Sequence, residues 1–295
     1  VVKEELSLTE DPSPSILDPV CGTGTFLSTA IGLMRRRILE KNDDEFDVFF
    51  DAPEKIRGMD GDPLAVALAR LNYLLALGDL VQEEHPPFLL PVYLADSTGE
   101  SGRIQNEDSV LTLSTAAGKF PLPAPFISNP LMLDWVLGRI TNYMGGAQLR
   151  LHVQSEEVAV QEVLNAYYNY LTSGKPRTPV PDALTPAQAD TALETARRLV
   201  HLHIRGQGTF WLHLVQNMAA PSIFAHRGFD RLVTHCPASL FDTYSEAYLR
   251  PGGHAAIITT LADAEAHSRG RRLVTMESLP GTAALVTGYE ERASL

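Results

Sequence analysis

Short apolar runs alternate with longer stretches of helical spacing along the N-terminal part of the chain. The apolar runs at residues 15–18, 55–60 and 91–94 predict strands. Apolar positions that recur every three or four residues predict helices at residues 25–41 and 63–77. Strands that alternate with helices form a parallel sheet with helices on both faces, so this pattern predicts a Rossmann-like α/β fold.

Prolines break this alternation between residues 97 and 207. Helical spacing persists near residues 154–171 and from residue 186 to about residue 203. Thr185 comes directly before Pro186, which is the arrangement of a helix N-cap followed by a first-turn proline. We therefore predict a largely helical insertion at residues 97–207.

The alternation of strands and helices returns after the insertion. The order is a helix, a strand, a helix and a strand, and then two apolar runs that are expected to pair as an antiparallel hairpin. These elements are predicted at residues 210–224, 229–234, 239–249, 254–259, 273–276 and 283–287. The expected organisation is one α/β domain in two parts, residues 1–96 and 208–295, on either side of the insertion.

A glycine-containing segment joins the first predicted strand to the first helix, and it reads Asp18-Pro-Val-Cys-Gly-Thr-Gly-Thr-Phe26. Glycines remove side-chain bulk and let the backbone approach a ligand. The N-terminus of the following helix presents unpaired N–H groups to an anionic group. The segment has neither the dinucleotide-binding glycine pattern nor the phosphate-binding loop pattern. It predicts a ligand loop of another kind, with a plain strand-to-helix turn as the alternative.

The segment resembles the D-P-x-C-G-x-G-x-F motif of N6-adenine-specific DNA methyltransferases, which are class I S-adenosylmethionine-dependent methyltransferases. The resemblance implies that this loop holds the methionine part of S-adenosylmethionine. The residues that match the motif are Asp18, Pro19, Cys21, Gly22, Gly24 and Phe26.

Two further carboxylates follow the next two predicted strands. Asp60 ends the second strand, and a carboxylate with two acceptor oxygens is able to accept hydrogen bonds from both hydroxyls of a ribose. The family's second motif has this form; Asp62 is the rival, with helix capping as its expected role. Asp96 matches the family's third motif, which implies that it accepts from the amino group of the cofactor's adenine. An Asp-Ser turn is the alternative for Asp96.

The catalytic motif of the family reads Asn-Pro-Pro followed by Tyr or Trp, and it comes after the fourth strand. Its Asn and a backbone carbonyl accept the amino protons of an adenine that is flipped out of the duplex, and its aromatic ring stacks on that base. The corresponding residues here are His235, Cys236, Pro237 and Ala238. The flanking sequence fits the family, with Phe229-Asp230 and an apolar strand before these residues, and a helix and a Pro-Gly-Gly turn after them.

The altered motif predicts weak or absent methyl transfer. A neutral imidazole offers one acceptor nitrogen, and a protonated imidazole offers none. Ala238 cannot stack, and the loss of one base-stacking contact costs about 1–3 kcal/mol. The Asn129-Pro130 pair is a less favoured catalytic candidate because it lies among prolines inside the insertion. A thiol couple of Cys236 with His235 is not expected, because adjacent side chains of an extended segment point to opposite faces.

Net charge and cysteine content limit the partners. The chain carries 24 basic and 36 acidic side chains, a net charge of −12. Phosphate contacts dominate nucleic-acid affinity, so we expect DNA to be held through a recognition domain or partner subunit outside this sequence. The two cysteines are too few for a disulfide framework or a zinc cluster, and His201, His203 and His213 lack supporting ligand spacing. We expect no metal.

Membrane attachment is not expected. The N-terminal residues are acidic, unlike a signal peptide, and no apolar run is expected to reach the roughly 18 residues of a membrane span. A cytoplasmic location is predicted. The leading hypothesis is S-adenosylmethionine-dependent methylation of adenine N6 in DNA, in restriction-modification or phage defence. A catalytically impaired cofactor-binding subunit or sensor is the first alternative, and methylation of another amino group, such as that of a protein glutamine, is the second.

Overall fold

The chain forms two compact units in a computed structural model. One unit contains residues Val1–Ser101 and Gly228–Leu295, and the other contains Gly102–Arg227. The structure describes residues 14–41, 43–82, 84–85, 88–97, 109–128, 130–150, 154–173, 184–207, 209–268, 275–278 and 283–289. Each unit is considered by itself below, the first as unit 1 and the second as unit 2.

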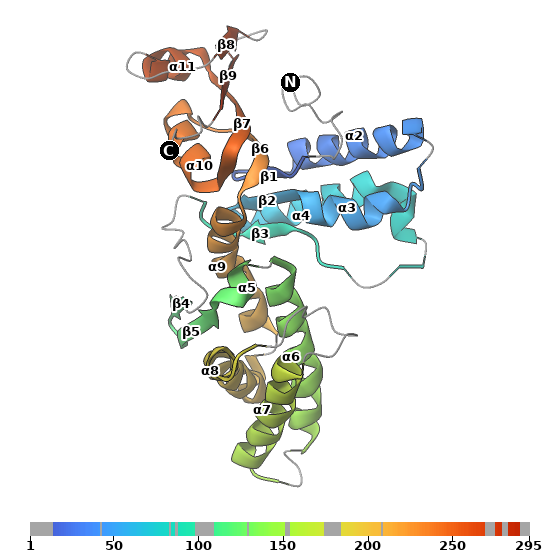
Figure 1. Cartoon of the computed structure of the whole chain (residues 1–295), viewed down its shortest axis with the longest axis vertical. Helices are drawn as coiled ribbons and strands as arrows, with labels where there is room; N and C mark the ends of the chain where they lie inside the picture. Colours follow the sequence, from blue (N-terminus) through green and yellow to red (C-terminus); the bar gives the residue numbers. More distant parts are fainter. Residues whose placement is uncertain are drawn as a thin grey trace. The chain divides into compact units, whose positions relative to one another are not determined.

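Unit 1 is built on a seven-stranded sheet with the order β3-β2-β1-β6-β7-β9-β8 (Figure 1). The five strands from β3 to β7 in this order are parallel, and β9 is antiparallel to both β7 and β8. The strands are β1 (Ile16–Asp18), β2 (Ile56–Asp60), β3 (Val92–Leu94), β6 (Phe229–His235), β7 (Leu249–Thr260), β8 (Thr275–Ser278) and β9 (Ala283–Tyr289). The predicted mostly parallel α/β sheet is therefore present, and so is the antiparallel pairing of the last two strands.

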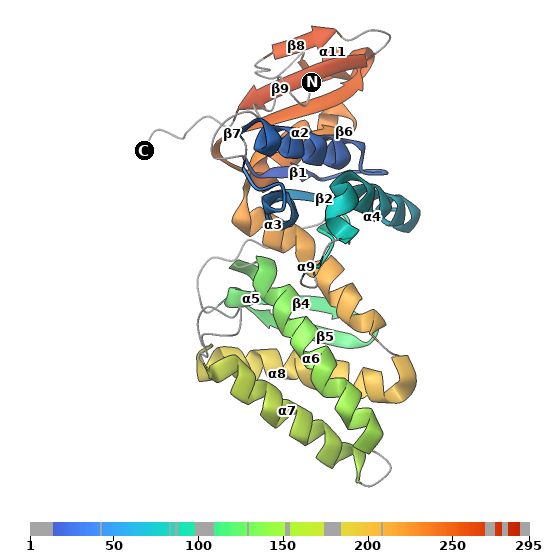
Figure 2. The ribbon, with the colours of Figure 1, turned by 90° about the vertical axis from the view of Figure 1, so that its right-hand side faces the viewer.

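Helices connect the parallel strands. The connections from β1 to β2 and from β2 to β3 contain α2 (Thr25–Lys41), α3 (Asp47–Lys55), α4 (Pro63–Leu77) and the 3₁₀ helix η1 (Gly78–Gln82). α2 and α4 pack side by side (Figure 2). The connection from β6 to β7 contains η3 (Ala238–Leu240) and α10 (Phe241–Tyr248), and α11 (Leu261–Ser268) follows β7. Because this connection runs across the sheet in the opposite direction, the right-handed rule places α10 on the other face.

The core of unit 1 lies between the parallel strands and the α2–α4 layer. Ile16, Val92 and Val233 line one face of the sheet and are buried against side chains such as Ile31 and Tyr73 from the helices. The Tyr73 hydroxyl donates a 3.2 Å hydrogen bond to the carbonyl of Ile56 on β2. Burial of apolar area of this kind is the main stabilising contribution to such a layer.

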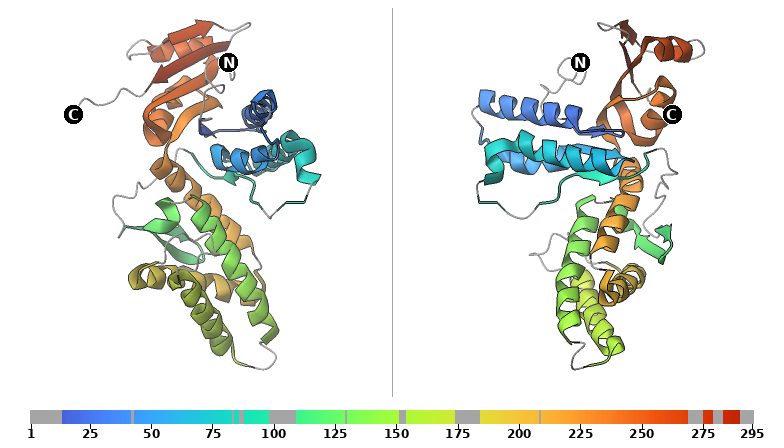
Figure 3. Two further views of the ribbon diagram at one scale, coloured as in Figure 1. Left: turned by 45° about the vertical axis from the view of Figure 1, so that its right-hand side comes forward. Right: turned by 180° about the vertical axis from the view of Figure 1, so that it is seen from behind.

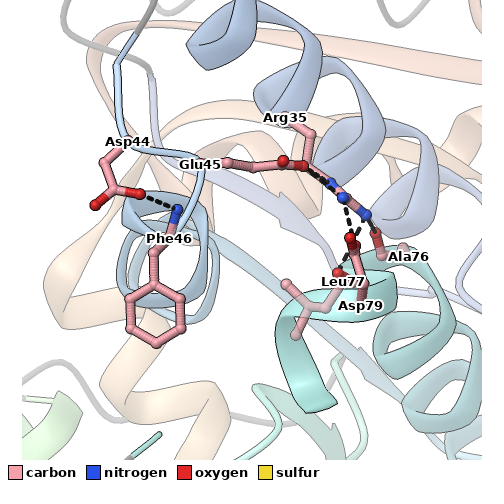
Figure 4. Close-up of polar contacts among 7 residues, drawn as sticks. All are labelled: Arg35, Asp44, Glu45, Phe46, Ala76, Leu77 and Asp79. Carbon is pink, nitrogen blue, oxygen red and sulfur yellow. Dashed lines mark hydrogen bonds and ion pairs between the residues drawn. The ribbon is translucent and has the colours of Figure 1, made fainter. Parts of the chain in front are cut away.

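Arg35 of α2 forms ion pairs with an acidic residue before α3 and another after α4 (Figure 4). The Arg35 guanidinium pairs with Glu45, forms a 2.8 Å ion pair with Asp79 and donates a 3.1 Å hydrogen bond to the carbonyl of Leu77. That carbonyl belongs to the last turn of α4, where free carbonyls otherwise lack partners. Arg35 therefore satisfies the end of α4 and holds it against α2.

α4 begins and ends at the residues that the sequence indicates. The Asp62 side chain accepts hydrogen bonds from the N–H groups of Leu64 and Ala65, and Gly78 closes the helix with a φ of 63°. Within the described residues, the helical segment Pro63–Gln82 is long and apolar enough to span a membrane by length and composition, although no such run was expected from the sequence. The segment connects the neighbouring strands β2 and β3, as a helix that covers a sheet does.

Unit 2 contains five α-helices and one hairpin within its described residues. The helices are α5 (Ala124–Ser128), α6 (Pro130–Arg150), α7 (Glu156–Thr172), α8 (Pro186–Leu202) and α9 (Phe210–Arg227), with a short helical segment η2 (His203–Gln207) after α8. Thr185 caps α8 as predicted, in a reciprocal pair of hydrogen bonds with Gln188. The β4–β5 hairpin (Val110–Thr115 and Gly118–Pro123) packs on α8, where Figure 3 shows it in green beside the yellow-olive helix.

The elements that were not expected from the sequence include α3 and the β4–β5 hairpin. α3 contains Pro53 and is only nine residues long, so its apolar period is too short to stand out. The β4–β5 hairpin lies in a region expected to be mostly helical, and two of the six β5 residues are Pro121 and Pro123, which usually argue against a strand. In a two-stranded hairpin both strands are edges, where a missing N–H is tolerated.

Two boundaries also differ from the sequence pattern. Unit 2 extends to Arg227 and so contains α9, whereas the sequence analysis ended the insertion at residue 207. β7 begins at Leu249 and includes the Pro-Gly-Gly segment that was expected to be a turn before the strand. A register shift between Phe229 and Arg231 on β6 accommodates this segment, in which Gly252 has a φ of 80°.

Candidate functional site

The candidate residues of unit 1 gather at one edge of the sheet. The parallel strands β1, β2, β3 and β6 end at this edge, and the segments that follow them contain the residues singled out from the sequence. In open parallel sheets, ligands bind outside the carboxyl ends of the strands, next to the point where the strand order reverses. β1 lies at that point here, because the chain proceeds from it to β2 on one side and β6 lies on its other side.

The loop from Cys21 to Gly24 turns sharply and is fixed on both sides. The Cys21 N–H donates a 3.0 Å hydrogen bond to the carbonyl of Met59 on β2, and the Gly24 N–H donates a 2.8 Å bond to the Cys21 carbonyl. Asn72 of α4 donates a 2.9 Å side-chain hydrogen bond to the carbonyl of Thr23. The loop is therefore held against β2 and α4 without any ligand.

The two glycines of the loop meet different constraints. Gly22 has a φ of 52°, and a Cβ added there would meet no heavy atom of the described residues within 4 Å. Gly24 has a φ of 81°, and a Cβ there would lie 3.0 Å from the Cβ of Ala69 on α4. Both conformations favour glycine. Gly24 allows α2 and α4 to approach, and Gly22 leaves the outer side of the loop open.

Asp60 contacts the loop directly. Its Oδ2 atom accepts a 2.9 Å hydrogen bond from the N–H of Gly22, and its Oδ1 atom accepts a 2.9 Å bond from the N–H of Asp62. Each carboxylate oxygen keeps a further lone pair, so the group retains acceptor capacity for a ligand. The structure thus brings the first and second predicted cofactor positions together on one side of the sheet edge.

Asp18 is completely buried at the end of β1. Its Oδ1 atom accepts a long, 3.3 Å hydrogen bond from the N–H of Val20, and its Oδ2 atom has no hydrogen-bond partner among the described residues. Burial raises the pKa of Asp18 to about 7; the nearby Thr234 hydroxyl lowers it, and the charge of Asp60 raises it. A buried carboxyl with an open acceptor atom has the chemistry to receive a cationic group.

The other residues of the motif are placed as parts of the fold. Pro19 is buried, and Phe26 is half-buried and packs against the core beneath α2. Asp62 caps α4, as expected, with its Oδ1 atom 2.7 Å from the N–H of Leu64. Asp62 therefore caps a helix, a role that Asp60 does not share.

The segment after β3 is tied to both sides of the site edge. The N–H of Ala95 donates a 3.0 Å hydrogen bond to the carbonyl of Asp60. Asp96 is exposed, whereas Ser97 is buried and donates a 3.1 Å hydrogen bond to the hydroxyl of Tyr244 on α10. Asp96 consequently lies beside the Asp60 position and presents its side chain to solvent.

The altered motif follows β6. His235 and Pro237 are exposed, and Cys236 and Ala238 are buried. The Cys236 N–H donates a 3.2 Å hydrogen bond to the carbonyl of Ile258 on β7. Ala238 is 1% exposed, so its side chain faces the protein interior and presents no surface for base stacking.

The two cysteine thiols are poorly suited to reaction. Burial raises the pKa of Cys236 to about 12, with a further contribution from Asp18. Burial, Asp18 and Asp60 likewise raise the pKa of Cys21 above its usual range. Thiolates are the reactive form of cysteine, so neither side chain has the character of a nucleophile at neutral pH.

The weaker candidates lie in unit 2. Asn129 falls outside the described residues, and Pro130 begins α6. His201 pairs with Glu156 through a 2.8 Å contact between Nδ1 and Oε1. Across the described ranges, no group of three histidine, cysteine or acidic side chains is arranged to hold a metal ion.

Three further residues build the site and were not expected from the sequence: Gly58, Asn72 and Thr234. Gly58 lies in the middle of β2, where a Cβ would come within 2.7 Å of Leu27 Cδ1 and 3.1 Å of Cys21 Cβ. A glycine inside a strand often marks such a close approach, and this signal was present in the sequence. Asn72 and Thr234 gave no comparable signal, because their roles depend on contacts across the fold.

Comparison with protein-family models gave no match. Comparison with curated protein sequences gave no match either.

The close approach at Gly58 predicts that Gly58→Ala destabilises unit 1. The new methyl group would collide with Leu27 and Cys21, and overpacking of this kind costs about 1–3 kcal/mol. Urea denaturation measures the change, with Gly61→Ala as the matched control, because a Cβ there meets no described heavy atom within 4 Å. Equal stabilities of the two variants would contradict the close packing of the loop on β2.

Proposed function

We propose that unit 1 is an S-adenosylmethionine-binding domain of the N6-adenine DNA methyltransferase type. The observation that carries this proposal is the direct hydrogen bond between Gly22 of the loop and Asp60 at the end of β2. It puts a loop with the D-P-x-C-G-x-G-x-F sequence next to a carboxylate suited to a ribose. The parallel sheet that ends in an antiparallel strand pair is also the arrangement expected of a class I methyltransferase.

Each part of the cofactor has a partner of suitable chemistry. The amino-acid end would lie against Cys21–Gly24, with its ammonium group near the buried, unpaired Oδ2 atom of Asp18. The ribose hydroxyls would donate to the remaining lone pairs of Asp60. The exocyclic amino group of the adenine would donate to Asp96, which is exposed beside Asp60. When bound, S-adenosylmethionine supplies an activated methyl group for transfer.

The proposed reaction is methyl transfer to the N6 amino group of adenine in DNA, in a restriction-modification or phage-defence setting in the cytoplasm. His235 would accept a hydrogen bond from one N–H of the target amino group through its single neutral acceptor nitrogen, and the carbonyl of Cys236 would accept a hydrogen bond from the other N–H. Ala238 supplies no ring for stacking, so the transition state lacks one contact that the family's aromatic residue provides.

Charge is divided unevenly between the units, and this bears on the DNA partner. Unit 1 contains 14 basic and 27 acidic side chains, whereas unit 2 contains ten basic and nine acidic side chains. The net charges are therefore −13 and +1. Because DNA affinity depends on neutralising phosphates, the acidic unit needs DNA contacts from elsewhere, either from unit 2 or from a partner.

A catalytically impaired cofactor-binding subunit or sensor is the second candidate function. The observation that favours it is the burial of Ala238, which removes the usual base-stacking surface. Such a protein would use the same cofactor site but would not transfer the methyl group.

Cofactor binding is tested by calorimetric titration with S-adenosylhomocysteine. We expect Asp60→Asn to weaken binding at least about tenfold, because a charged acceptor is lost from the ribose hydroxyls. Asp62→Asn is the matched control: asparagine retains the capping role, so its affinity is expected to match that of the unaltered protein. Loss of binding in both variants to the same degree, or in neither, argues against the assignment of Asp60.

The raised pKa of Asp18 predicts pH-dependent binding. In the free protein the carboxyl holds its proton below pH 7, and an ammonium group favours the ionised form. The dissociation constant of S-adenosylhomocysteine should therefore fall about tenfold from pH 6 to pH 8, with binding releasing nearly one proton at pH 6 and almost none at pH 8. Titrations in buffers of different ionisation enthalpy measure both quantities.

Asp18→Asn provides the control for this pH dependence. It should flatten the pH profile and weaken binding. It should also raise the free energy of unfolding at pH 8, because the folded-state pKa of Asp18 is elevated and its ionisation therefore costs stability as the pH rises towards 7. A pH profile that is unchanged by the substitution rules out Asp18 as the titrating group.

Transfer of a labelled methyl group to unmethylated DNA separates the enzyme from the sensor. The sensor hypothesis predicts cofactor binding without transfer, whereas the enzyme hypothesis predicts slow transfer to adenine. In the enzyme, His235→Asn should raise the rate, because an amide oxygen supplies the acceptor of the family's motif. An unchanged rate would contradict the placement of the motif at residues 235–238.

A further inference from the structure

Two tyrosines of α10 hold the segment that follows β3. The Tyr244 hydroxyl accepts a 3.1 Å hydrogen bond from the Ser97 hydroxyl, and the Tyr248 hydroxyl donates a 2.8 Å hydrogen bond to the Ser97 carbonyl. Both tyrosine side chains are buried, and their ring centroids lie 6.4 Å apart. Ser97 is thus bound through both its side chain and its backbone to α10, a helix from a distant part of the sequence.

These contacts fix the residues on both sides of Asp96. Ala95 is buried and bonded to the carbonyl of Asp60, and Ser97 is buried and bonded to α10. Asp96 lies between them and is exposed. With both neighbours anchored, the backbone at Asp96 has little freedom, so its carboxylate projects from a rigid base.

The same tyrosine lies among the other groups of the site edge. Burial raises the pKa of Tyr244, the Ser97 hydroxyl lowers it, and the nearby Cys236, Asp96 and Asp18 raise it further. α10 begins at Phe241, soon after the altered motif that ends at Ala238. The helix therefore links the altered motif at residues 235–238 to the segment that contains Asp96.

We propose that Tyr244 and Tyr248 are positioning residues that orient Asp96 to recognise the exocyclic amino group of the cofactor's adenine. The proposal rests on the proposed function, since it assumes that a nucleoside cofactor binds at this edge. It assigns α10 the task of setting the base specificity of the cofactor site. The tyrosines act through Ser97 and do not need to touch the cofactor.

The test compares S-adenosylhomocysteine with S-inosylhomocysteine, which has an oxygen in place of the adenine amino group. The unaltered protein is expected to prefer the adenine compound by about tenfold or more, because a carboxylate facing an oxygen loses its donor. Tyr244→Phe should reduce this preference at least about threefold, and Tyr248→Phe should change it in the same direction.

Tyr73→Phe is the matched control. It also removes one buried tyrosine hydroxyl from a hydrogen bond to a backbone carbonyl, but it lies in the α4 core and contacts β2. A general loss of stability would affect all three variants, and thermal unfolding by circular dichroism measures that loss. The ratio of the two affinities should change only in the α10 variants.

Three outcomes overturn the proposal, and they differ from one another. If the unaltered protein binds neither compound, the proposed function fails as well. If it binds both equally, Asp96 does not recognise the amino group. If it prefers the adenine compound and Tyr244→Phe keeps the full preference, Asp96 is oriented without α10. A reduced ratio in the Tyr244 variant, with the Tyr73 variant unchanged, supports the proposal.

Discussion

The site edge depends on where two carboxylates are placed at the ends of neighbouring parallel strands. Asp18 is fully buried at the end of β1, and Asp60 ends β2 with both its oxygens bonded to backbone N–H groups. Ionised carboxylates in the interior are costly unless they are paired or hydrogen-bonded. Asp60 accepts hydrogen bonds from the N–H groups of Gly22 and Asp62, whereas Asp18 keeps a buried, unpaired acceptor atom and a pKa raised to about 7. Asp60 holds the loop, and Asp18 has an acceptor atom that lacks a hydrogen-bond donor or a cation.

Much of unit 1 is predictable because its signals are local. The helix over Pro63–Leu77 has a capping aspartate, a first-turn proline and a closing glycine, and the structure has the same bounds. The positions of β1, β2 and β6 follow from short apolar runs that end at polar or glycine residues. The juxtaposition of Gly22 with Asp60 also follows, because parallel strands end at a common edge.

The missed features depend on contacts that local patterns do not encode. α3 is short and contains a proline, and the β4–β5 hairpin has prolines in a strand, so neither has a clear period. The anchoring of Ser97 by Tyr244 joins residues that are 147 positions apart. The orphaned oxygen of Asp18 likewise emerges only when β6 lies beside β1. For this reason the sequence indicates which residues bear the chemistry, but not how they are held.

The altered motif fits the proposed function less well than the cofactor-binding residues do. The cofactor side of the edge has an ordered loop and two adjacent carboxylates, but the acceptor side has a histidine in place of an amide and a buried alanine in place of a ring. The most direct test of the cofactor side is a crystal structure of the protein with S-adenosylhomocysteine. We predict the amino-acid end against Cys21–Gly24 and both ribose hydroxyls on the Asp60 carboxylate. Ligand density away from the carboxyl edge of β1 and β2 would contradict the account.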